Sequence, residues 1–526
     1  MSAQRRWTSW LIVAVLFLVI LTHYGIWTET IDINSITQSA ASHFTDYRAK
    51  ANTNPPQVAL DSVPEPTTPT PALTPETPAC PQQSTCPEPS KPAFLDMPND
   101  YALSSAEDLM CEKFFTEKYV QTIATHPTSL CSNNGSAVTE FEVPTHPAHR
   151  KLAPATQVFL FQGVHWDPNT RAFVARSDDR TASPAIYGQT PLGSLRYDKA
   201  APGCRSASER QLIIYPALWE GTFPNIWHRL LELWQAKLSF DAVRIALDPD
   251  SGSPYITKSQ ATQAKVVFPD DIPGPWTDLW EIVTGSPAQS PSTLSTDTCY
   301  DVIIPTVGWA SPFWSALLTS KYESCPRQTL MTSFVNNIMK FYKVTPKQPA
   351  EISARQHPTI TIVQRGHSRK FQDFDSLLEK LHQRHPESAI NVVDLELLSK
   401  REQIGLAAET DVWVAHHGAG MMYQMFMQRN AAVVEIVPPI FVSRGFRWIA
   451  RMRGLVHFIG KAMWKAEYEE KYKGVPKPAD WKPERQGDSD ANNWQFEEWI
   501  WITHDEILDL VDAAVLSQKH RSNDLS

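Results

Sequence analysis

The pattern of apolar and polar residues changes character along the chain. Residues 10–27 read WLIVAVLFLVILTHYGIW and carry no formal charge, whereas residues from about 51 to 92 are rich in Pro, Thr and Ser. From about residue 101 onward, short apolar runs alternate with helix-length amphipathic segments. The Pro-rich stretch cannot bury a core and favours extended polyproline geometry. The pattern therefore predicts a stem ahead of a folded region.

The first apolar run has the length and the flanking charges of a membrane anchor, since roughly 20 apolar residues cross a bilayer as a helix. Arg5 and Arg6 precede the run, while Glu29 and Asp32 follow it, so the positive-inside rule leaves the short amino-terminal tail in the cytosol. A cleaved signal peptide is the alternative, but no clear small-x-small cleavage site follows the run. We expect an uncleaved type II anchor, with nearly everything after it luminal or extracellular.

The first part of the folded region contains short apolar runs that suit buried strands, at residues 158–161, 212–214 and 302–305. Helix-like segments lie between these runs. The clearest covers residues 225–238 and has an apolar face formed by Ile226, Leu230, Leu231 and Trp234. This alternation indicates an α/β region.

A second block begins near Thr359, where strands and helices alternate more regularly. The expected strands are residues 360–365, 390–393, 412–415 and 433–436; the expected helices are residues 374–385, 399–409 and 505–516, with a further helix start at 421–426. Strands separated by helices of about ten residues imply parallel pairing, because a parallel strand needs a long crossover. The block therefore predicts a parallel, doubly wound sheet.

Composition narrows the class of protein. The chain has 526 residues, of which 42% are hydrophobic and 20% charged, and its formal net charge of −9 argues against nucleic acid binding, which needs clustered Lys and Arg. Its seven cysteines show no zinc-ligand spacing, and an oxidising compartment favours disulfides. The odd count leaves one thiol over, which we expect at Cys80 or Cys86. Asn134 begins the single N-glycosylation sequon and predicts an exposed luminal loop.

The sharpest local signal is His416-His417-Gly418-Ala419-Gly420, which follows an expected strand and precedes an apolar helix. Ligands of open α/β sheets collect at the carboxyl ends of strands. Glycines there let the backbone approach a phosphate, and a helix start offers free N–H groups and a positive dipole end. His417 can add a hydrogen bond or partial charge to a diphosphate. A tight turn without a ligand explains these five residues equally well.

Two further features favour an anion site. Arg365 and Arg369 lie just past another strand end of the same block, and guanidinium groups bind a diphosphate and compensate its charge. Glu435 lies within an apolar strand, where a carboxylate is costly unless it is paired, and a ribose diol is a suitable partner. A solvated basic loop and a satisfied core glutamate are the alternatives. We expect the two strand ends to converge on an anion.

Asp248-Pro249-Asp250 has the D-x-D spacing that can hold a metal ion. Ser251-Gly252-Ser253 follows it, which is typical of a turn, and no clear apolar strand end with matching downstream ligands accompanies it. We therefore expect a turn at this position and no required metal ion or other cofactor.

Residues 360–439 resemble glycosyltransferase family 61, which includes plant β-1,2-xylosyltransferase and animal O-linked N-acetylglucosaminyltransferases. The matching segments run in order: the R-x-x-x-R of Arg365 and Arg369, then EQIGLAAETDVWVAHHGAG, then VVEIVPP. Gln403 and Asp411 fall at motif positions of the family, as does Glu435. The upstream segment PNIWHRLLELW is similar to the family's N-x-x-H before a helix.

The chain also departs from the family pattern, and both departures bear on donor specificity. His416 occupies a position where a small residue is common. Met421, Met422 and Tyr423 follow the HGAG turn, where the family usually has Leu and then a polar pair.

The resemblance implies a GT-B fold of two Rossmann-like domains, a nucleotide diphospho-sugar donor, and inversion at the anomeric carbon. Together with the hydropathy pattern, it divides the chain into a cytosolic tail (1–9), a transmembrane anchor (10–27), a stem (28–100), an N-terminal acceptor-side domain (101–345), a C-terminal nucleotide-sugar-binding domain (346–500) and a C-terminal helix (501–526). The donor-binding residues that it implies are Arg365, Arg369, His417, Gly418, Ala419, Gly420 and Glu435.

An inverting transfer also needs a general base that deprotonates the acceptor hydroxyl. His228 matches the family's upstream histidine and is one candidate for this catalytic role. A histidine on a Leu- and Trp-rich helix can instead be simply packed, and Glu220 or Glu232 could serve as the base.

The sequence thus predicts a type II membrane enzyme of the Golgi or endoplasmic reticulum. We expect it to transfer xylose or N-acetylglucosamine from a UDP-sugar to a glycan or glycoprotein acceptor. Two alternatives stay open: a non-catalytic glycan-binding protein with the same fold, and a GT-B transferase that uses a GDP-sugar.

Overall fold

The computed structural model describes most of the predicted folded region. The described residues are 94–101, 115–133, 136–144, 157–176, 195–204, 209–216, 225–269, 274, 276–306, 308, 328–346, 357–439, 445–471 and 498–520. All of them belong to one compact unit, Pro87–Ser526. The predicted tail, the anchor at 10–27, residues 28–93 of the stem and Asn134 lie outside these ranges. Within the ranges, no helix has both the length and the apolar composition to cross a membrane.

The first part of the unit is built around a mixed sheet of eight strands. Their order is β1-β2-β3-β8-β6-β7, with β4 beside β3 and β5 beside β4. The β6 strand pairs in parallel with β7 and β8, and β5 with β4, whereas the remaining pairs are antiparallel. The strands are β1 (Pro127–Asn133), β2 (Ser136–Glu142), β3 (Gln157–Asp167), β4 (Ala172–Ala175), β5 (Leu195–Tyr197), β6 (Gln211–Ile214), β7 (Lys265–Val266) and β8 (Cys299–Ile304).

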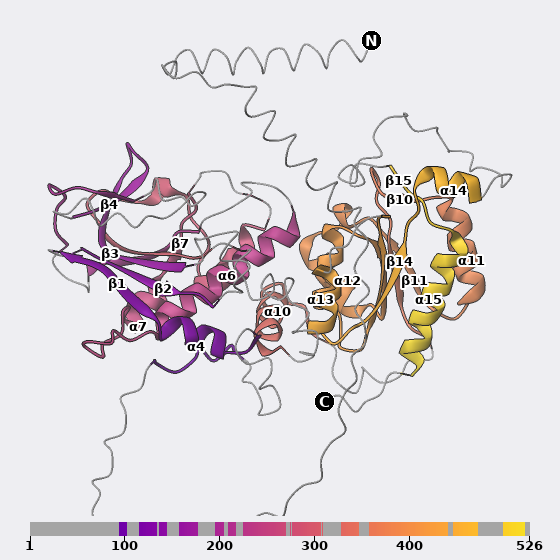
Figure 1. Cartoon of the computed structure of the whole chain (residues 1–526), viewed down its shortest axis with the longest axis horizontal. Coiled ribbons are helices and arrows are strands. Elements are labelled where there is room, and N and C mark those ends of the chain that lie inside the picture. The colour runs from indigo at the N-terminus through magenta and orange to yellow at the C-terminus, as the bar shows by residue number, and fades with distance from the viewer. Residues whose placement is uncertain are drawn as a thin grey trace, which may run out of the picture. The chain divides into compact units, whose positions relative to one another are not determined.

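A long helix, α6 (Ile226–Ile245), buries its apolar side in the core beside this sheet (Figure 1). The Asn225 side chain caps it by accepting the Trp227 N–H, and Leu230 and Trp234 pack in one cluster with strand residues such as Leu160. The predicted strand segments and the predicted helix are confirmed, and α6 runs further than expected. The other helices here are α4 (Lys118–Ala124), α7 (Lys258–Gln263), η5 (Asp278–Trp280), α8 (Glu281–Thr284), η6 (Pro291–Thr293) and α10 (Thr329–Phe341).

The second part contains a sheet of five parallel strands in the order β11-β9-β12-β13-β14. The parallel sheet expected from the strand–helix alternation is therefore confirmed. Its strands are β9 (Ile360–Val363), β11 (Ile390–Val393), β12 (Val412–His416), β13 (Ala432–Val437) and β14 (Val456–Lys461), and a separate pair is formed by β10 (Lys370–Phe371) and β15 (Trp499–Ile500).

Both faces of this second sheet are buried. Val412 and Val414 of β12 pack in one cluster with α11 and α15, whereas Trp413 and Ala415 pack in the other with α12 and α13. Figure 1 shows these two pairs of helices on opposite sides of the sheet. Burial on both faces explains why the strands are continuous apolar runs. The helices are α11 (Phe374–Arg384), η10 (Leu395–Leu397), α12 (Lys400–Glu409), η11 (Ala419–Phe426), α13 (Gly445–Met452), α14 (Lys465–Lys471) and α15 (His504–Lys519).

The first sheet differs from the expectation of two Rossmann-like domains. Only its β8-β6-β7 portion and the β4–β5 pair are parallel. The reason lies in the connections: β1 ends at Asn133 and β2 begins at Ser136, and β3 and β4 are separated by residues 168–171. Such links are too short for a crossover helix and force antiparallel pairing. The Rossmann-like expectation is thus supported by the second sheet alone.

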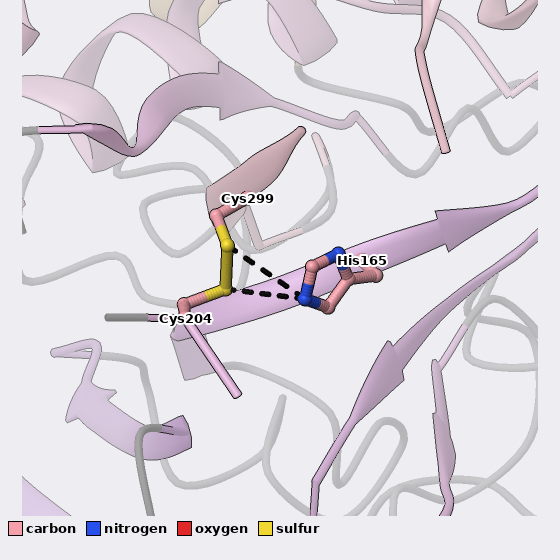
Figure 2. A group of neighbouring side chains, drawn as sticks. All are labelled: His165, Cys204 and Cys299. Carbon is pink, nitrogen blue, oxygen red and sulfur yellow. Dashed lines mark hydrogen bonds between the residues drawn. A yellow bond between two sulfur atoms is a disulfide. The ribbon is translucent and has the colours of Figure 1, made fainter. Parts of the chain in front are cut away.

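A disulfide joins Cys204 to Cys299 at the start of β8, as expected for an oxidising compartment. His165 of β3 lies beside it, with Nε2 3.4 Å from Cys204 Sγ and 3.7 Å from Cys299 Sγ (Figure 2). This group has the residue types of a metal site, but both sulfurs are bonded to each other and offer no thiolate ligand. The predicted spare thiol at Cys80 or Cys86 lies outside the described residues.

Candidate functional site

The strand order of the second sheet creates a crevice between β9 and β12. After β9 the chain moves outward to the edge strand β11, and it then returns to the other side of β9 to form β12, β13 and β14. Such a reversal separates the two strand–helix connections at the carboxyl ends of the strands, where ligands of open α/β sheets bind.

A large cavity of about 790 Å³ opens at this point. Its size is within the range of small-molecule sites. It brings together the ends of β9, β11 and β12, the start of α12 and residues of the first part of the unit. The lining residues are Ile226, Trp276, Asp278, Tyr342, Val363, Arg365, Asp394, Leu395, Glu396, Leu398, Ser399, Lys400, Arg401, Gln403, Ala415, His416, Ala419, Gly420 and Tyr423.

The turn after β12 forms one wall of the large cavity. Gly418 has φ 156°, a conformation that side-chain-bearing residues rarely adopt, and a Cβ built there would lie 2.7 Å from Nη1 of Arg369. The backbone therefore favours glycine, and a larger residue would also displace the Arg369 guanidinium. Ala419 and Gly420 follow and line the cavity.

The segment after this turn differs from the expected α-helix start. Residues Ala419–Phe426 form the 3₁₀ helix η11, beginning with a hydrogen bond from the Met421 N–H to the Gly418 carbonyl. Residues 421–426 are all buried, so this segment has no exposed polar face. The 3₁₀ helix η11 nevertheless begins at the large cavity, which Ala419 lines.

Arg369 is held against the outside of the turn. Its backbone has φ 55°, an uncommon value for a non-glycine residue, and its Nη1 donates a hydrogen bond to the His417 carbonyl at 3.0 Å. Burial, and then the nearby charge of Arg365, lower the pKa of Arg369 to about 10. The residue stays cationic at neutral pH, next to the turn.

Arg365 lines the large cavity and is partly exposed. Its Nη2 donates to Glu396 Oε1 at 3.3 Å. An exposed pair of this kind contributes little stability, so the guanidinium can exchange Glu396 for a ligand at small cost. Arg365 and Arg369 therefore place positive charge on two sides of the turn.

His417 belongs to a buried charge network behind the turn. Its Nδ1 lies 2.5 Å from Glu435 Oε1, and Nε2 of His457 lies 2.9 Å from Glu435 Oε2. Burial opposes ionisation of Glu435, but the hydrogen bonds and charges of the two histidines outweigh it and hold the pKa of Glu435 below its usual value. The His417 ring also packs on Phe446, with the ring centroids 4.9 Å apart.

The ribose contact predicted for Glu435 does not fit this arrangement. Glu435 is 2% exposed, and each of its oxygens faces a histidine. It lines neither the large cavity nor a small cavity beside it, which Arg369, His416 and His417 help to line. Its position on β13, opposite Ala415 of β12, directs it under the turn. Glu435 orients His417 instead of meeting a ligand.

Gln403 and Asp411, the other motif positions, hold the frame of the site. The Gln403 amide donates to the Leu395 and Leu398 carbonyls and its oxygen accepts from the Tyr423 hydroxyl. Asp411 is buried and accepts the Thr359 N–H at 2.9 Å, at the end of the sheet away from the cavity. Gln403 shapes the cavity floor, whereas Asp411 aligns β9 with β12.

The opposite wall of the large cavity is aromatic. Tyr342 donates its hydroxyl to Asp278 at 2.9 Å, and Asp278 also pairs with Lys400. The Trp276 ring lies 5.1 Å from the Lys400 ammonium and 6.4 Å from the Tyr423 ring. Three cationic side chains (Arg365, Lys400 and Arg401) and three anionic ones (Asp278, Asp394 and Glu396) line this cavity. A flat group could stack here while its charges face the turn.

His228 lies in the first turn of α6 and is partly exposed. It is not among the residues that line either cavity, although Ile226, two positions earlier, lines the large one. Its neighbour Trp227 packs edge-on against Phe446 at 4.8 Å, and the same Phe446 meets the His417 ring. The helix start that carries His228 is therefore connected to His417 through the packed rings of Trp227 and Phe446.

The D-x-D segment is a turn, as predicted. Asp248 Oδ1 accepts the backbone N–H groups of Asp250 and Ser251, and Gly252 has φ 68°. These backbone bonds are the main cause of the lowered pKa of Asp248. Its carboxylate thus serves the turn itself.

The structure brings Arg365, Ala419 and Gly420 to the large cavity, and Arg369 and His417 to the small cavity next to it. The sequence alone did not predict that the start of α12 and the aromatic residues Trp276 and Tyr342 line the large cavity. The first had a visible signal, because Ser399 and Glu402 form a capping box directly after a strand and a short link. Trp276 and Tyr342 had none, since nothing local places them beside the second sheet.

Comparison with models of known protein families gives a match. A family model described as Glycosyltransferase 61 matches residues 283–434, which include Arg365, Arg369 and the turn at 416–420 but neither His228 nor Glu435. This match supports the family to which the sequence motifs pointed. A search of curated proteins found no match.

Proposed function

We propose that this chain, which a family 61 glycosyltransferase model matches over residues 283–434, is an inverting enzyme that uses a UDP-sugar and a glycan or glycoprotein acceptor. The family implies a nucleotide-sugar donor and a glycan acceptor. We propose xylose or N-acetylglucosamine as the transferred sugar. The observation that carries the proposal is the large cavity at the β9–β12 crevice, which Arg365 lines together with Ala419 and Gly420.

In this proposal the nucleoside occupies the large cavity and the diphosphate lies on the turn at 418–420. Arg365 is partly exposed beside that path, and Arg369 holds its charge against the outer side of Gly418. Backbone approach at the glycines and two guanidinium groups suit a diphosphate. His417, oriented by Glu435, completes the cradle.

The proposed chemistry needs no metal ion. As the bond between the sugar and the diphosphate breaks, negative charge grows on the leaving group, and Arg365, Arg369 and His417 stabilise it. The acceptor hydroxyl attacks from the opposite face and loses its proton to a general base. We keep His228 as the candidate base because its helix start packs through Trp227 and Phe446 onto the His417 ring.

We further propose the setting that the sequence predicted. The two parts of the unit would act as the two halves of a GT-B transferase, with the donor site in the second part. The run at 10–27 would anchor the enzyme as a type II protein of the Golgi or endoplasmic reticulum. The disulfide between Cys204 and Cys299 supports a luminal location, since such bonds are rare in the cytosol.

A nucleotide-sugar panel tests the function. UDP, GDP and their sugars would be assayed for binding and for transfer, with the unchanged protein, Arg365→Ala and Arg384→Ala. Arg384 is a matched control because it also pairs with exposed carboxylates, Asp509 and Asp512, but lies on α11. We expect UDP-sugars to bind and react, and Arg365→Ala alone to weaken both.

The same panel separates the alternatives. Preference for GDP-sugars would replace the proposed donor by a GDP-sugar. Donor binding without transfer or hydrolysis, over a range of glycan acceptors, would favour a non-catalytic glycan-binding protein. Equal activity of Arg365→Ala and the unchanged protein would refute the proposed donor site.

A further inference from the structure

A second, small cavity lies on the other side of the His416–Gly420 turn. Its volume is about 30 Å³, and it shares His416 with the large cavity. Arg369, His417, Trp499 and Trp501 are among its lining residues. A space of this size holds about one water molecule or one hydroxyl group.

His416 lines this small cavity, as well as the large one, and carries an acceptor that is unpartnered within the part of the chain that the structure describes. Its Nδ1 lies 3.0 Å from the His417 carbonyl oxygen, which can only accept, so Nδ1 carries the proton and Nε2 keeps a lone pair. The residue is 4% exposed, and its Nε2 has no hydrogen-bond partner among the described residues. Burial first, and then the charge of Arg369, lower the pKa of His416 to about 3. The ring is therefore neutral at physiological pH.

Trp499 and Trp501 line the same cavity, and each carries a donor that is unpartnered within the described part of the chain. Trp499 begins β15, and Trp501 directly follows the end of that strand. Their side chains are 8% and 2% exposed. Neither indole N–H has a hydrogen-bond partner among the described residues. A buried indole N–H usually finds a partner. Two such donors and one such acceptor around one small cavity indicate a missing polar group.

The chemistry of that group follows from this donor–acceptor set. A hydroxyl can donate its hydrogen to Nε2 of His416 while its oxygen accepts from the indoles. A phosphate oxygen cannot donate, and it would meet the lone pair of Nε2. An apolar group would leave all three polar atoms unpaired at a cost. A hydroxyl, like a water molecule, satisfies both kinds of partner.

We propose that His416, Trp499 and Trp501 form a subsite that binds one hydroxyl group of the sugar carried by the nucleotide donor. The inference rests on the proposed function for the placement of the donor. With the nucleoside in the large cavity and the diphosphate on the turn, the sugar at the far end of the diphosphate reaches the small cavity on the other side. The subsite would thus discriminate between sugars and not between nucleotides.

The test measures how much the sugar adds to binding. Affinities of UDP, GDP and their sugars, including deoxy-sugar analogues, would be measured by calorimetry on the unchanged protein, His416→Phe, Trp499→Phe and Trp501→Phe. Trp234→Phe is the control, because Trp234 is also buried with an unpartnered indole N–H among the described residues but packs against Phe334. Circular dichroism would check that each variant folds.

We expect one or more of the three subsite variants to weaken binding of the preferred nucleotide sugar by about 5- to 100-fold, with bare nucleotide affinity unchanged. The loss should vanish for the deoxy analogue that lacks the bound hydroxyl, and Trp234→Phe should show none. The subsite is refuted if all variants keep the full sugar contribution, as they would if a buried water alone fills the cavity. It is also refuted if bare nucleotide binding falls equally.

These outcomes are distinct from failure of the proposed function. A protein that binds nucleotide sugars but never transfers them would lose the proposed function, while the sugar contribution to binding would still decide the subsite. A protein that binds no nucleotide would refute both.

Discussion

The network of Glu435 with His417 and His457 allows the sharpest single test of the site's architecture. Glu435→Gln keeps the shape of the side chain and removes its charge. One carboxylate oxygen becomes an NH₂ group, so one of the two histidine contacts, at 2.5 Å and 2.9 Å, changes from attraction to an encounter of two donors. Glu435 is buried, so water cannot supply a replacement.

The magnitude follows from the loss of one hydrogen bond to a charged group. Such bonds contribute about 1.5–3 kcal/mol, so Glu435→Gln should lower the free energy of unfolding by about that amount at neutral pH. Because His417 also loses its orientation, transfer activity should fall as well. Urea denaturation followed by tryptophan fluorescence, together with donor turnover, measures both effects.

The stability that Glu435 contributes should depend on pH in a definite direction. The folded-state pKa of Glu435 lies below the ordinary value of 4.5, so its ionised form stabilises the fold above that value. This contribution is lost as pH falls through the folded pKa. The stability difference between the unchanged protein and Glu435→Gln should therefore be constant near neutral pH and shrink below pH 4.5.

Two results would refute this account. One is a variant as stable as the unchanged protein at neutral pH, and the other is a stability difference that persists undiminished in acid. Glu379→Gln is the control, because Glu379 is exposed on α11 and should change neither stability nor turnover.

Three other predictions address the turn, the donor charge and the disulfide. Gly418→Ala should reduce donor affinity, measured by calorimetry, because its Cβ would lie 2.7 Å from Nη1 of Arg369; unchanged affinity would contradict the close packing. Arg365→Ala should lower kcat/KM at least about tenfold without changing the unfolding midpoint, since its Glu396 pair is exposed; normal turnover would exclude it from the donor site. Replacing Cys204 and Cys299 by Ser should cost about 2–5 kcal/mol of stability in urea titrations, and no loss would show the bond to be dispensable.

Much of the second sheet was determined by the sequence. The strands expected at 360–365, 412–415 and 433–436 correspond to β9, which ends at Val363, and to β12 and β13. They could be recognised because strands buried on both faces are nearly continuous apolar runs. Helix signals were also local: Ser399 and Glu402 form the capping box that starts α12. The turn at Gly418 could be predicted because glycine adopts backbone conformations that are nearly closed to other residues.

Tertiary structure alone decided what those residues do. The sequence placed Glu435 on a strand but could not identify the side chains that pair with it. His417 directly follows β12, and His457 lies at the start of β14. The sequence also did not predict that residues 419–426 form a 3₁₀ helix instead of an α-helix. Trp499 and Trp501 lie far along the chain from His416 and meet it only because β15 pairs with β10 near the end of β12. Local patterns determine strands, caps and turns, whereas the partner of a buried polar atom depends on distant segments that only the folded chain brings together.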